Sequence, residues 1–329
     1  MDYPFDIEEI FAREGLGSIR LPRRQAGSSP QGLTVTLLAD YTVSTGAWLP
    51  SAAIVALLAE SGVSSAGARA AISRLARRGV LESNRQGRKT FYRLTQSVAA
   101  HLRAGGGWVA SYGAGTAMWD DRWTLVAFSL PQEAALQRRA LRNHLRWMGF
   151  APLYDALWIS PREFAAKAWS ELDEMNLDAL TVFRARHLDI ATGAGRNPID
   201  AWDLSAIATQ YETFIRRWRQ VVAGVHAGQL AGAQAVRTRT EVMDTYRRFS
   251  TLDPQLPEKL LPAGWLRQAA RDVFVAVYDG LADSAEQHVR AVAAAHAAGP
   301  LPEIHANTVA DLLSGDLPER TPVPSSTDA

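Results

Sequence analysis

The sequence predicts a multidomain α+β protein with a winged helix-turn-helix, a central ferredoxin-like α/β sandwich and a helical carboxy-terminal domain. Three observations carry this prediction. The chain has 329 residues, more than one compact core usually holds. Helical periodicity over residues 33–78 gives way to two strand-like segments around a glycine. Residues 118–200 then alternate strand and helix patterns, and a largely helical stretch follows.

The first folded part is expected over residues 29–105, after an amino-terminal extension or arm over residues 1–28. Apolar residues recur at the spacing of one helix face, and a serine at position 64 or 65 can accept an orphan backbone N–H at a helix start. The predicted helices are 33–41, 51–60 and a third that runs from Ser64 or Ser65 to about Arg78 and stops at Gly79.

A β-hairpin is expected directly after these helices. Residues 80–85 and 89–95 are rich in strand formers and flank the turn Gln86-Gly87-Arg88. A short helix at 97–103 and the run Gly105-Gly106-Gly107 are then expected to mark the boundary of this part.

The central domain is predicted over residues 118–200 and the helical domain over residues 201–299. In the central domain we expect three strands separated by two helices. Proline, serine and threonine near the end of the chain suggest that residues 300–329 form a largely disordered tail. The expected strands are 123–130, 156–159 and 179–187, and the expected helices are 131–147, 161–175, 204–222, 231–249 and 264–298.

Composition excludes several classes of protein. The chain contains no cysteine, which excludes disulfides, thiol nucleophiles and cysteine metal sites. Neither a signal peptide nor a run of 18 apolar residues is present. We therefore expect a cytoplasmic, nucleoid-associated protein without a membrane partner.

Charge is distributed unevenly along the chain. Residues 1–105 carry 13 Lys/Arg against 8 Asp/Glu, whereas the remainder carries 22 against 26. A basic front followed by a slightly acidic rear indicates that the front binds an acidic polymer.

The third helix and the hairpin together predict a surface for double-stranded DNA. If Ala68 and Leu75 face the core, the serines and arginines of the helix project outward, where arginine can bind guanine and serine can bind a base or a phosphate. A basic hairpin grips phosphates, and a basic arm can enter a minor groove. The candidate DNA-binding residues are Ser64, Ser65, Arg69, Ser73, Arg74 and Arg77 of the helix, Arg85, Arg88 and Lys89 of the hairpin, and Arg23 and Arg24 of the arm.

Several segments, in this order, resemble the PaaX family of phenylacetate-pathway repressors. They are SAGARAAISRLARRGVLE (65–82), RQGRKTFYRLT (85–95), WTLVAFS (123–129), Gly149-Phe150 with LWISP (157–161), and Leu256-Pro257 through Leu260-Leu261-Pro262 to Trp265. The resemblance spans roughly residues 20–285. It implies a homodimeric transcriptional repressor with a central domain similar to CRISPR-associated nucleases. It also implies release from a near-palindromic operator by an acyl-coenzyme A effector, an aryl acyl thioester similar to phenylacetyl-coenzyme A.

Such an effector needs cations for its phosphates and an apolar slot for its acyl group. Apart from this effector ligand, we expect the protein to bind no cofactor and no metal ion. The candidate ligand-binding residues are Arg184, Arg186, His187, Trp158, Trp202, Tyr211 and Arg216.

Two other functions stay open at this stage. A metal-dependent nuclease of the ferredoxin-like type would need an acid at the end of the first central strand, where the sequence instead reads Ala127-Phe128-Ser129. A winged-helix adaptor that binds proteins would not need a basic outer face. The sequence lacks phosphate-loop, zinc-protease and serine-elbow motifs, so we expect no catalytic residues and no enzyme.

Overall fold

The computed structural model describes residues 29–115, 118–131, 133–164, 169, 172, 179–188, 196–297 and 303–314. They form two compact units. One holds residues 115–212 and 249–268, and the other holds the preceding residues together with 213–248 and everything after 268. The predicted arm at 1–28, with Arg23 and Arg24, lies outside the described residues, as does most of the helix predicted at 161–175.

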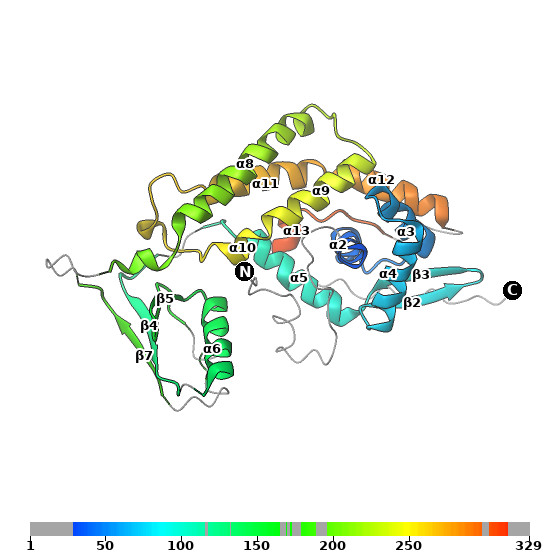
Figure 1. Cartoon of the computed structure of the whole chain (residues 1–329). Helices are drawn as coiled ribbons and strands as arrows, with labels where there is room; N and C mark the ends of the chain where they lie inside the picture. Colours follow the sequence, from blue (N-terminus) through cyan, green and yellow to red (C-terminus); the bar gives the residue numbers. More distant parts are fainter. Residues whose placement is uncertain are drawn as a thin grey trace. The chain divides into compact units, whose positions relative to one another are not determined.

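The larger unit begins with an amino-terminal module of three helices and three short strands (Figure 1). The helices are α2 (Pro30–Thr42), α3 (Ser51–Glu60) and α4 (Ser65–Arg77). Strands β2 (Leu81–Gln86) and β3 (Lys89–Leu94) form an antiparallel hairpin, and β1 (Leu49–Pro50) pairs with the other edge of β3. The sheet order is thus β1-β3-β2.

Local sequence explains where these helices begin. Proline at the first position of α2 lacks an N–H that would have no helical partner there. The Ser29 hydroxyl accepts a hydrogen bond from the backbone N–H of Gly32 at 3.1 Å, and Ser64 does the same for Gly67 at the start of α4.

Helix α5 (Gln96–Ser111) continues through the three glycines that were expected to mark a boundary. The reason lies in tertiary packing. A Cβ on Gly106 would lie 2.9 Å from Cδ2 of Leu312, and one on Gly107 would lie 3.0 Å from the Leu312 carbonyl oxygen. The glycines therefore allow a second backbone to approach the helix closely.

That second backbone is the carboxy-terminal segment, which corrects the expectation of a largely disordered tail for its described part. Residues 303–314 are extended and then helical in α13 (Val309–Ser314), with Ile304, Ala306 and Leu312 buried. We call residues 303–314 the clasp. Helix α13 has only six residues, too few to show helical periodicity in the sequence, so no sequence signal predicted it.

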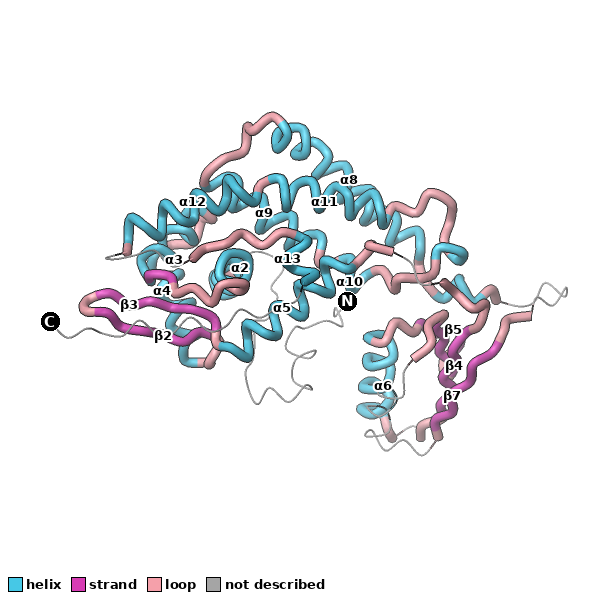
Figure 2. Tube along the Cα trace, turned by 180° about the vertical axis from the view of Figure 1, so that it is seen from behind, coloured by secondary structure: helices cyan, strands magenta, loops and turns pink. Residues whose placement is uncertain are grey.

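Long helices complete the larger unit: α8 (Leu204–His226) from residue 213 on, α9 (Ala233–Tyr246), α11 (Arg267–Gly280) from residue 269 on, and α12 (Ala282–His296). Figure 2 shows α9, α11 and α12 on the same side of α2, which is seen nearly end-on. Helix α12 packs on both α9 and α3. The single helix predicted at 264–298 is in fact two, which separate at Leu281, where the backbone leaves helical geometry.

The smaller unit contains a four-stranded antiparallel sheet in the order β5-β6-β4-β7. One face packs on α6 (Ala135–Trp147) around a core that includes Trp158, and the opposite face buries Trp123 and Ile159. The predicted strands are present, and a further strand, β5, precedes β6. The strands are β4 (Trp123–Phe128), β5 (Ala151–Tyr154), β6 (Leu157–Ser160) and β7 (Leu180–Ala185); α10 (Phe249–Leu252) and two 3-10 turns, Pro198–Ala201 and Glu258–Leu260, also lie in this unit.

Candidate nucleic-acid interface

Helix α4 divides its residues cleanly between a core face and an exposed face. Ala68, Ala71, Ile72 and Leu75 are buried beneath it. The predicted DNA-contacting residues lie on the other side, so the structure brings them together on one surface of one helix. The exposed residues are Ser65, Arg69, Ser73, Arg74 and Arg77, with the capping Ser64 beside them.

The arginines on this face are available to an external partner. Among the residues that the structure describes, we find no ion pair or hydrogen bond of the Arg69, Arg74 or Arg77 side chains. Three positive charges on one helix face, with no acidic residue in its first turn, form a surface suited to an anion. Guanidinium groups can bind guanine edges or phosphates in two-point geometry.

The hairpin carries a second group of cations. Arg85 and Arg88 are exposed close to its turn, where Gly87 adopts a positive φ of 58°. Arg85 donates to the Gly87 carbonyl at 3.3 Å, a contact that leaves most of its guanidinium donors free for another group. The hairpin extends from the body of the module in Figure 1.

Lys89 differs from its neighbours because it already has a partner inside the protein. Its side chain is half-buried, and its Nζ donates to the backbone carbonyl of His296 at 2.7 Å. The structure thus places this predicted phosphate contact at the junction of the hairpin with α12.

Sequence reasoning missed Arg93, which fixes the hairpin to the preceding turn. Its side chain is buried and pairs with Glu82 at 2.7 Å, while its guanidinium carbon lies 4.3 Å from the ring centroid of Trp48. It also donates to the carbonyl of Gly46. The sequence signal was its position two residues after Phe91, which puts both side chains on the same face of the strand.

The predicted ligand-binding residues do not gather at one place. Trp158 is 1% exposed and lies in the core beneath α6, whereas Trp202 stacks on Trp123 at 6.0 Å on the opposite face of the sheet. Tyr211 is buried and donates to Asp253 at 2.7 Å. Arg216 belongs to the other compact unit, and Arg186 and His187 are exposed after β7.

Arg184 is committed to structure within the central sheet. It donates to Oγ1 of Thr124 at 2.8 Å and pairs with Asp120 at 2.7 Å. Desolvation alone would raise the pKa of Asp120, but the hydrogen bonds from Arg184 and the Arg122 backbone, together with the charges of both arginines, outweigh it and lower that pKa. The adjacent Asp121 pairs with Lys259 instead, so the two acids before β4 do not face one ion. The described residues contain no group of three or more side chains suited to a metal.

The described helices also include none with both the length and the apolar character needed to cross a bilayer.

Comparison with known proteins agrees with this architecture. Three family models match in sequence: PaaX-like protein over residues 29–98, PaaX protein central Cas2-like domain over 116–195, and PaaX-like protein C-terminal domain over 202–291. The chain is 31% identical over 243 residues to the transcriptional repressor PaaX of Escherichia coli strain K12, an alignment covering 72% of this chain and 75% of that protein.

A solved structure has a similar fold. The uncharacterized protein Rv0674 from Mycobacterium tuberculosis superposes with a TM-score of 0.52 at 20% identity, covering 79% of this chain and 96% of that one. Sequence identity this low supports a common fold alone. The three ordered family matches and the 31% identical relative together establish that the chain belongs to the PaaX family.

Proposed function

We propose that this protein is a transcriptional repressor that binds duplex DNA through a winged helix-turn-helix made of α2, α3, α4 and the β2–β3 hairpin. The observation that carries the proposal is the exposed face of α4, where Arg69, Arg74 and Arg77 have no partner among the described residues. The similarity to a transcriptional repressor supports the same function.

In this proposal α4 is the recognition helix in the major groove. Arg69 and Arg74 would read guanine edges, and Ser65 and Ser73 would bind bases or phosphates. Arg85 and Arg88 in the hairpin would bind phosphates or the neighbouring minor groove, which adds affinity without sequence preference. Arg23 and Arg24 would act as a minor-groove arm.

We further propose that the protein acts in the cytoplasm as a homodimer on a near-palindromic operator. Two recognition helices related by a two-fold axis would enter successive major grooves about one helical turn apart. The central sheet would be a ferredoxin-like sandwich, because its antiparallel order β5-β6-β4-β7 is the one that a βαββαβ unit gives.

An acyl-coenzyme A, with an aryl acyl group similar to phenylacetyl, is the effector we propose. The family resemblance is the main support. In the smaller unit, the Trp123 ring centroid lies 5.2 Å from that of Trp119 and 6.0 Å from that of Trp202. The Nζ of Lys259 lies 5.9 Å from the Trp119 ring centroid. Aromatic faces beside a cation suit an aryl group attached to a phosphorylated carrier.

Binding to the DNA that flanks the protein's own gene tests the proposal. Purified protein would be titrated by fluorescence anisotropy into this duplex and into an unrelated duplex of equal length, with and without a panel of aryl acyl thioesters. We expect tight binding to the flanking DNA alone and its release by one thioester. Equal affinity for both duplexes would contradict sequence-specific repression, whereas specific binding that no thioester releases would contradict only the effector.

The same labelled duplex tests the alternative that the protein is a nuclease. Incubation of the labelled duplex with Mg²⁺ or Mn²⁺, followed by denaturing electrophoresis, should leave it intact. The arrangement of Asp120 and Asp121, each paired with its own cation, supports this expectation.

A further inference from the structure

The carboxyl end of α2, the first helix of the amino-terminal module, is capped by residues more than 250 positions away in sequence. The Nδ2 of Asn307 donates to the Ala39 carbonyl at 2.8 Å, and its backbone N–H donates to the Asp40 carbonyl at 3.0 Å. The backbone N–H of His305 donates to the Tyr41 carbonyl at 3.1 Å. Carbonyls in the last turn of a helix have no helical partner, so the clasp supplies what α2 lacks.

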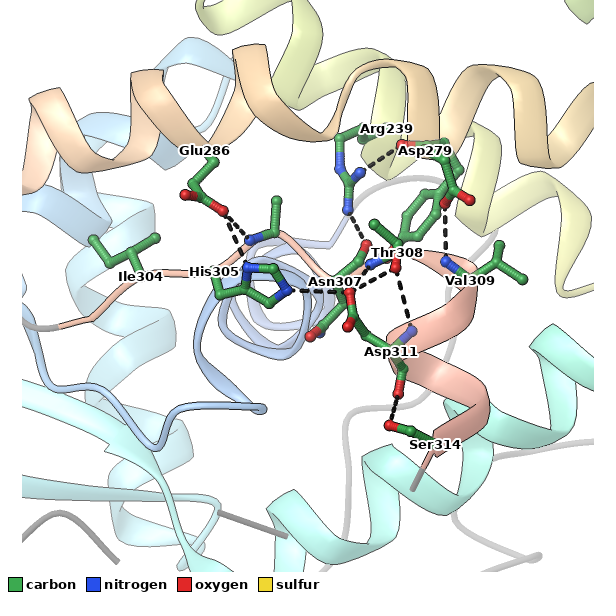
Figure 3. Close-up of polar contacts among 12 residues, drawn as sticks. Arg239, Asp279, Glu286, Ile304, His305, Asn307, Thr308, Val309, Asp311 and Ser314 are labelled. Atoms are coloured by element: carbon green, nitrogen blue, oxygen red, sulfur yellow. Dashed lines mark hydrogen bonds and ion pairs between the residues drawn. The ribbon is translucent and has the colours of Figure 1, made fainter. Parts of the chain in front are cut away.

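The same clasp is held by three helices of the carboxy-terminal domain (Figure 3). The Arg239 side chain of α9 donates to the Asn307 carbonyl at 2.7 Å. The Asp279 carboxylate of α11 accepts from the backbone N–H of Val309 at 2.9 Å, and the Glu286 carboxylate of α12 accepts from that of Ala306 at 2.9 Å. Each bond involves the clasp backbone, so together they fix its path.

A buried polar cluster lies where the clasp, α2, α9 and α11 meet. Arg239 is fully buried, and its guanidinium carbon lies 3.9 Å from the Tyr278 ring centroid. The Tyr278 hydroxyl donates to the Asp40 carboxylate at 3.0 Å. Burial raises the pKa of Asp40, although the charge of Arg239 opposes that rise. Separating one member of this cluster would leave a buried charge without its partners, which is strongly unfavourable. The free-energy cost of separating one member is therefore a large part of the cost of separating all of them.

The far end of the clasp is fixed by packing. Leu312 of α13 is buried against the glycine run of α5, where any Cβ on Gly106 or Gly107 would collide with it. Its neighbour Leu313 is 48% exposed. The clasp is thus bound at both ends and along its middle.

We propose that the clasp positions the DNA-binding module, with Asn307 as the positioning residue that joins α2 to the carboxy-terminal helices. The inference rests on the proposed function and adds the regulation of the same site. When the clasp is seated, α2 and the helices α9, α11 and α12 form one body, which holds α4 in its DNA-binding geometry. When it is released, only a fraction of molecules hold that geometry, and apparent affinity for the operator, whose bases α4 must reach, falls by the same fraction. Binding to unrelated DNA rests on phosphate contacts and depends less on that geometry.

This arrangement gives the carboxy-terminal helices a route to the recognition helix. A displacement of α9, α11 or α12 would move Arg239, Asp279 or Glu286 and so strain the clasp bonds that cap α2. The clasp contacts α9, α11 and α12 on one side and α2 on the other. Such a continuous chain of contacts is what physical coupling between two sites requires.

The test compares Asn307→Ala and Leu312→Ala with the matched control Leu313→Ala in the full chain. Each protein would be titrated into the flanking duplex and the unrelated duplex. Hydrogen exchange would be followed in peptides covering residues 39–46 and 65–77, and urea unfolding would confirm that each variant is folded. If a variant holds the DNA-binding module in place in only about one molecule in ten, its affinity for the operator falls about tenfold.

We expect that loss for Asn307→Ala and Leu312→Ala, with faster exchange in both peptides and a much smaller change in affinity for the unrelated duplex. Leu313→Ala should match the wild type. A merely destabilising change would weaken binding to both duplexes alike and would refute a positioning role, as would wild-type affinity in both clasp variants. If Leu312→Ala does not fold, Asn307→Ala alone decides, because it keeps the backbone bonds and the α13 packing.

Failure of the proposed function has a different signature. If the wild type does not distinguish the two duplexes, the repressor assignment falls. Exchange at residues 65–77 then decides the clasp by itself, because unchanged exchange in Asn307→Ala would show that α2 and α4 do not depend on it.

Discussion

The Nζ of Lys89 in the hairpin lies 2.7 Å from the backbone carbonyl of His296, the last residue of α12. A cation at a helix carboxyl end interacts favourably with the helix dipole and satisfies a carbonyl that has no helical partner. The adjacent Arg88 is exposed. Two neighbouring basic residues that look equivalent in sequence therefore differ in their surroundings: the Lys89 ammonium contacts the end of α12, and the Arg88 side chain is exposed.

This difference predicts distinct salt dependences for Arg88→Ala and Lys89→Ala. If Arg88 binds a phosphate, its loss should reduce the slope of log affinity against log salt by about 0.9. The loss of Lys89 should reduce that slope by less than half as much, because its ammonium is already engaged by His296. Anisotropy titrations between 50 and 200 mM salt, about the range over which such slopes are usually resolved, measure both. Equal changes would show that Lys89 leaves His296 when DNA binds.

The exposed face of α4 predicts which arginines set specificity. Arg69→Ala or Arg74→Ala should cost roughly 1–3 kcal/mol of operator affinity if the residue binds a guanine, and should relax preference at one base position. Competition titrations against single-base variants of the duplex reveal that position. Arg219→Ala, which removes an exposed charge of α8 instead, is the control and should leave specificity unchanged. Wild-type affinity in both α4 variants would mean that another face of the module meets DNA.

The two serines at the start of α4 predict different stability effects. The Ser64 hydroxyl accepts from the Gly67 N–H, so Ser64→Ala should reduce the free energy of unfolding by about 1 kcal/mol. Ser65 is exposed inside the first turn, and Ser65→Ala should change stability by less than about 0.5 kcal/mol. Thermal unfolding without DNA measures both. A similar loss in the two variants would argue against the cap.

Local signals explain why the amino-terminal module could be predicted from sequence. Ser64 caps α4, and Gly79, with a positive φ of 71°, follows its last turn, so the helix starts and stops where its own residues dictate. The spacing of Ala68, Ala71, Ile72 and Leu75 fixed the buried face, and the exposed residues followed from it. Prediction succeeded wherever the cause lay within a few residues of the effect.

Long-range contacts explain what sequence could not supply. Gly106 and Gly107 look like a boundary in isolation, but they lie inside α5, where they let Leu312 pack closely against the helix. The aromatic and basic residues predicted as a ligand site have the right chemistry, but Trp158 and Trp202 pack on opposite faces of one sheet. Residue type indicated which chemistry was possible, and tertiary pairing decided which residues share a surface.

In the smaller unit, the carboxylate of Asp253 accepts hydrogen bonds from the side chains of Arg267, Tyr211 and Trp265 and from the backbone N–H of Gln255. Arg267 binds it through two nitrogens at 2.8 and 2.9 Å, and the Tyr211 hydroxyl donates at 2.7 Å. Burial is the largest single influence and would raise the pKa of Asp253, but the hydrogen bonds and charge of Arg267, with the hydrogen bonds from Tyr211 and Gln255, together outweigh it and hold that pKa below its usual value. The ionised form of the Asp253 carboxyl group therefore stabilises the folded state.

This lowered pKa predicts acid sensitivity that Asp253→Asn should remove. The contribution of a depressed carboxyl is complete above its unfolded pKa, about 3.9, and is lost as pH falls through the lower folded value. The amide leaves Arg267 without its charge partner, so the variant should lose about 3–5 kcal/mol at neutral pH. It should also show a shallower fall in stability below about pH 4 than the wild type. Urea unfolding followed by tryptophan fluorescence over this pH range tests both statements. Glu241→Gln, which breaks the exposed pair with Arg217, is the control and should cost no more than about 1 kcal/mol. An Asp253→Asn protein with wild-type acid sensitivity would place the responsible carboxylate elsewhere.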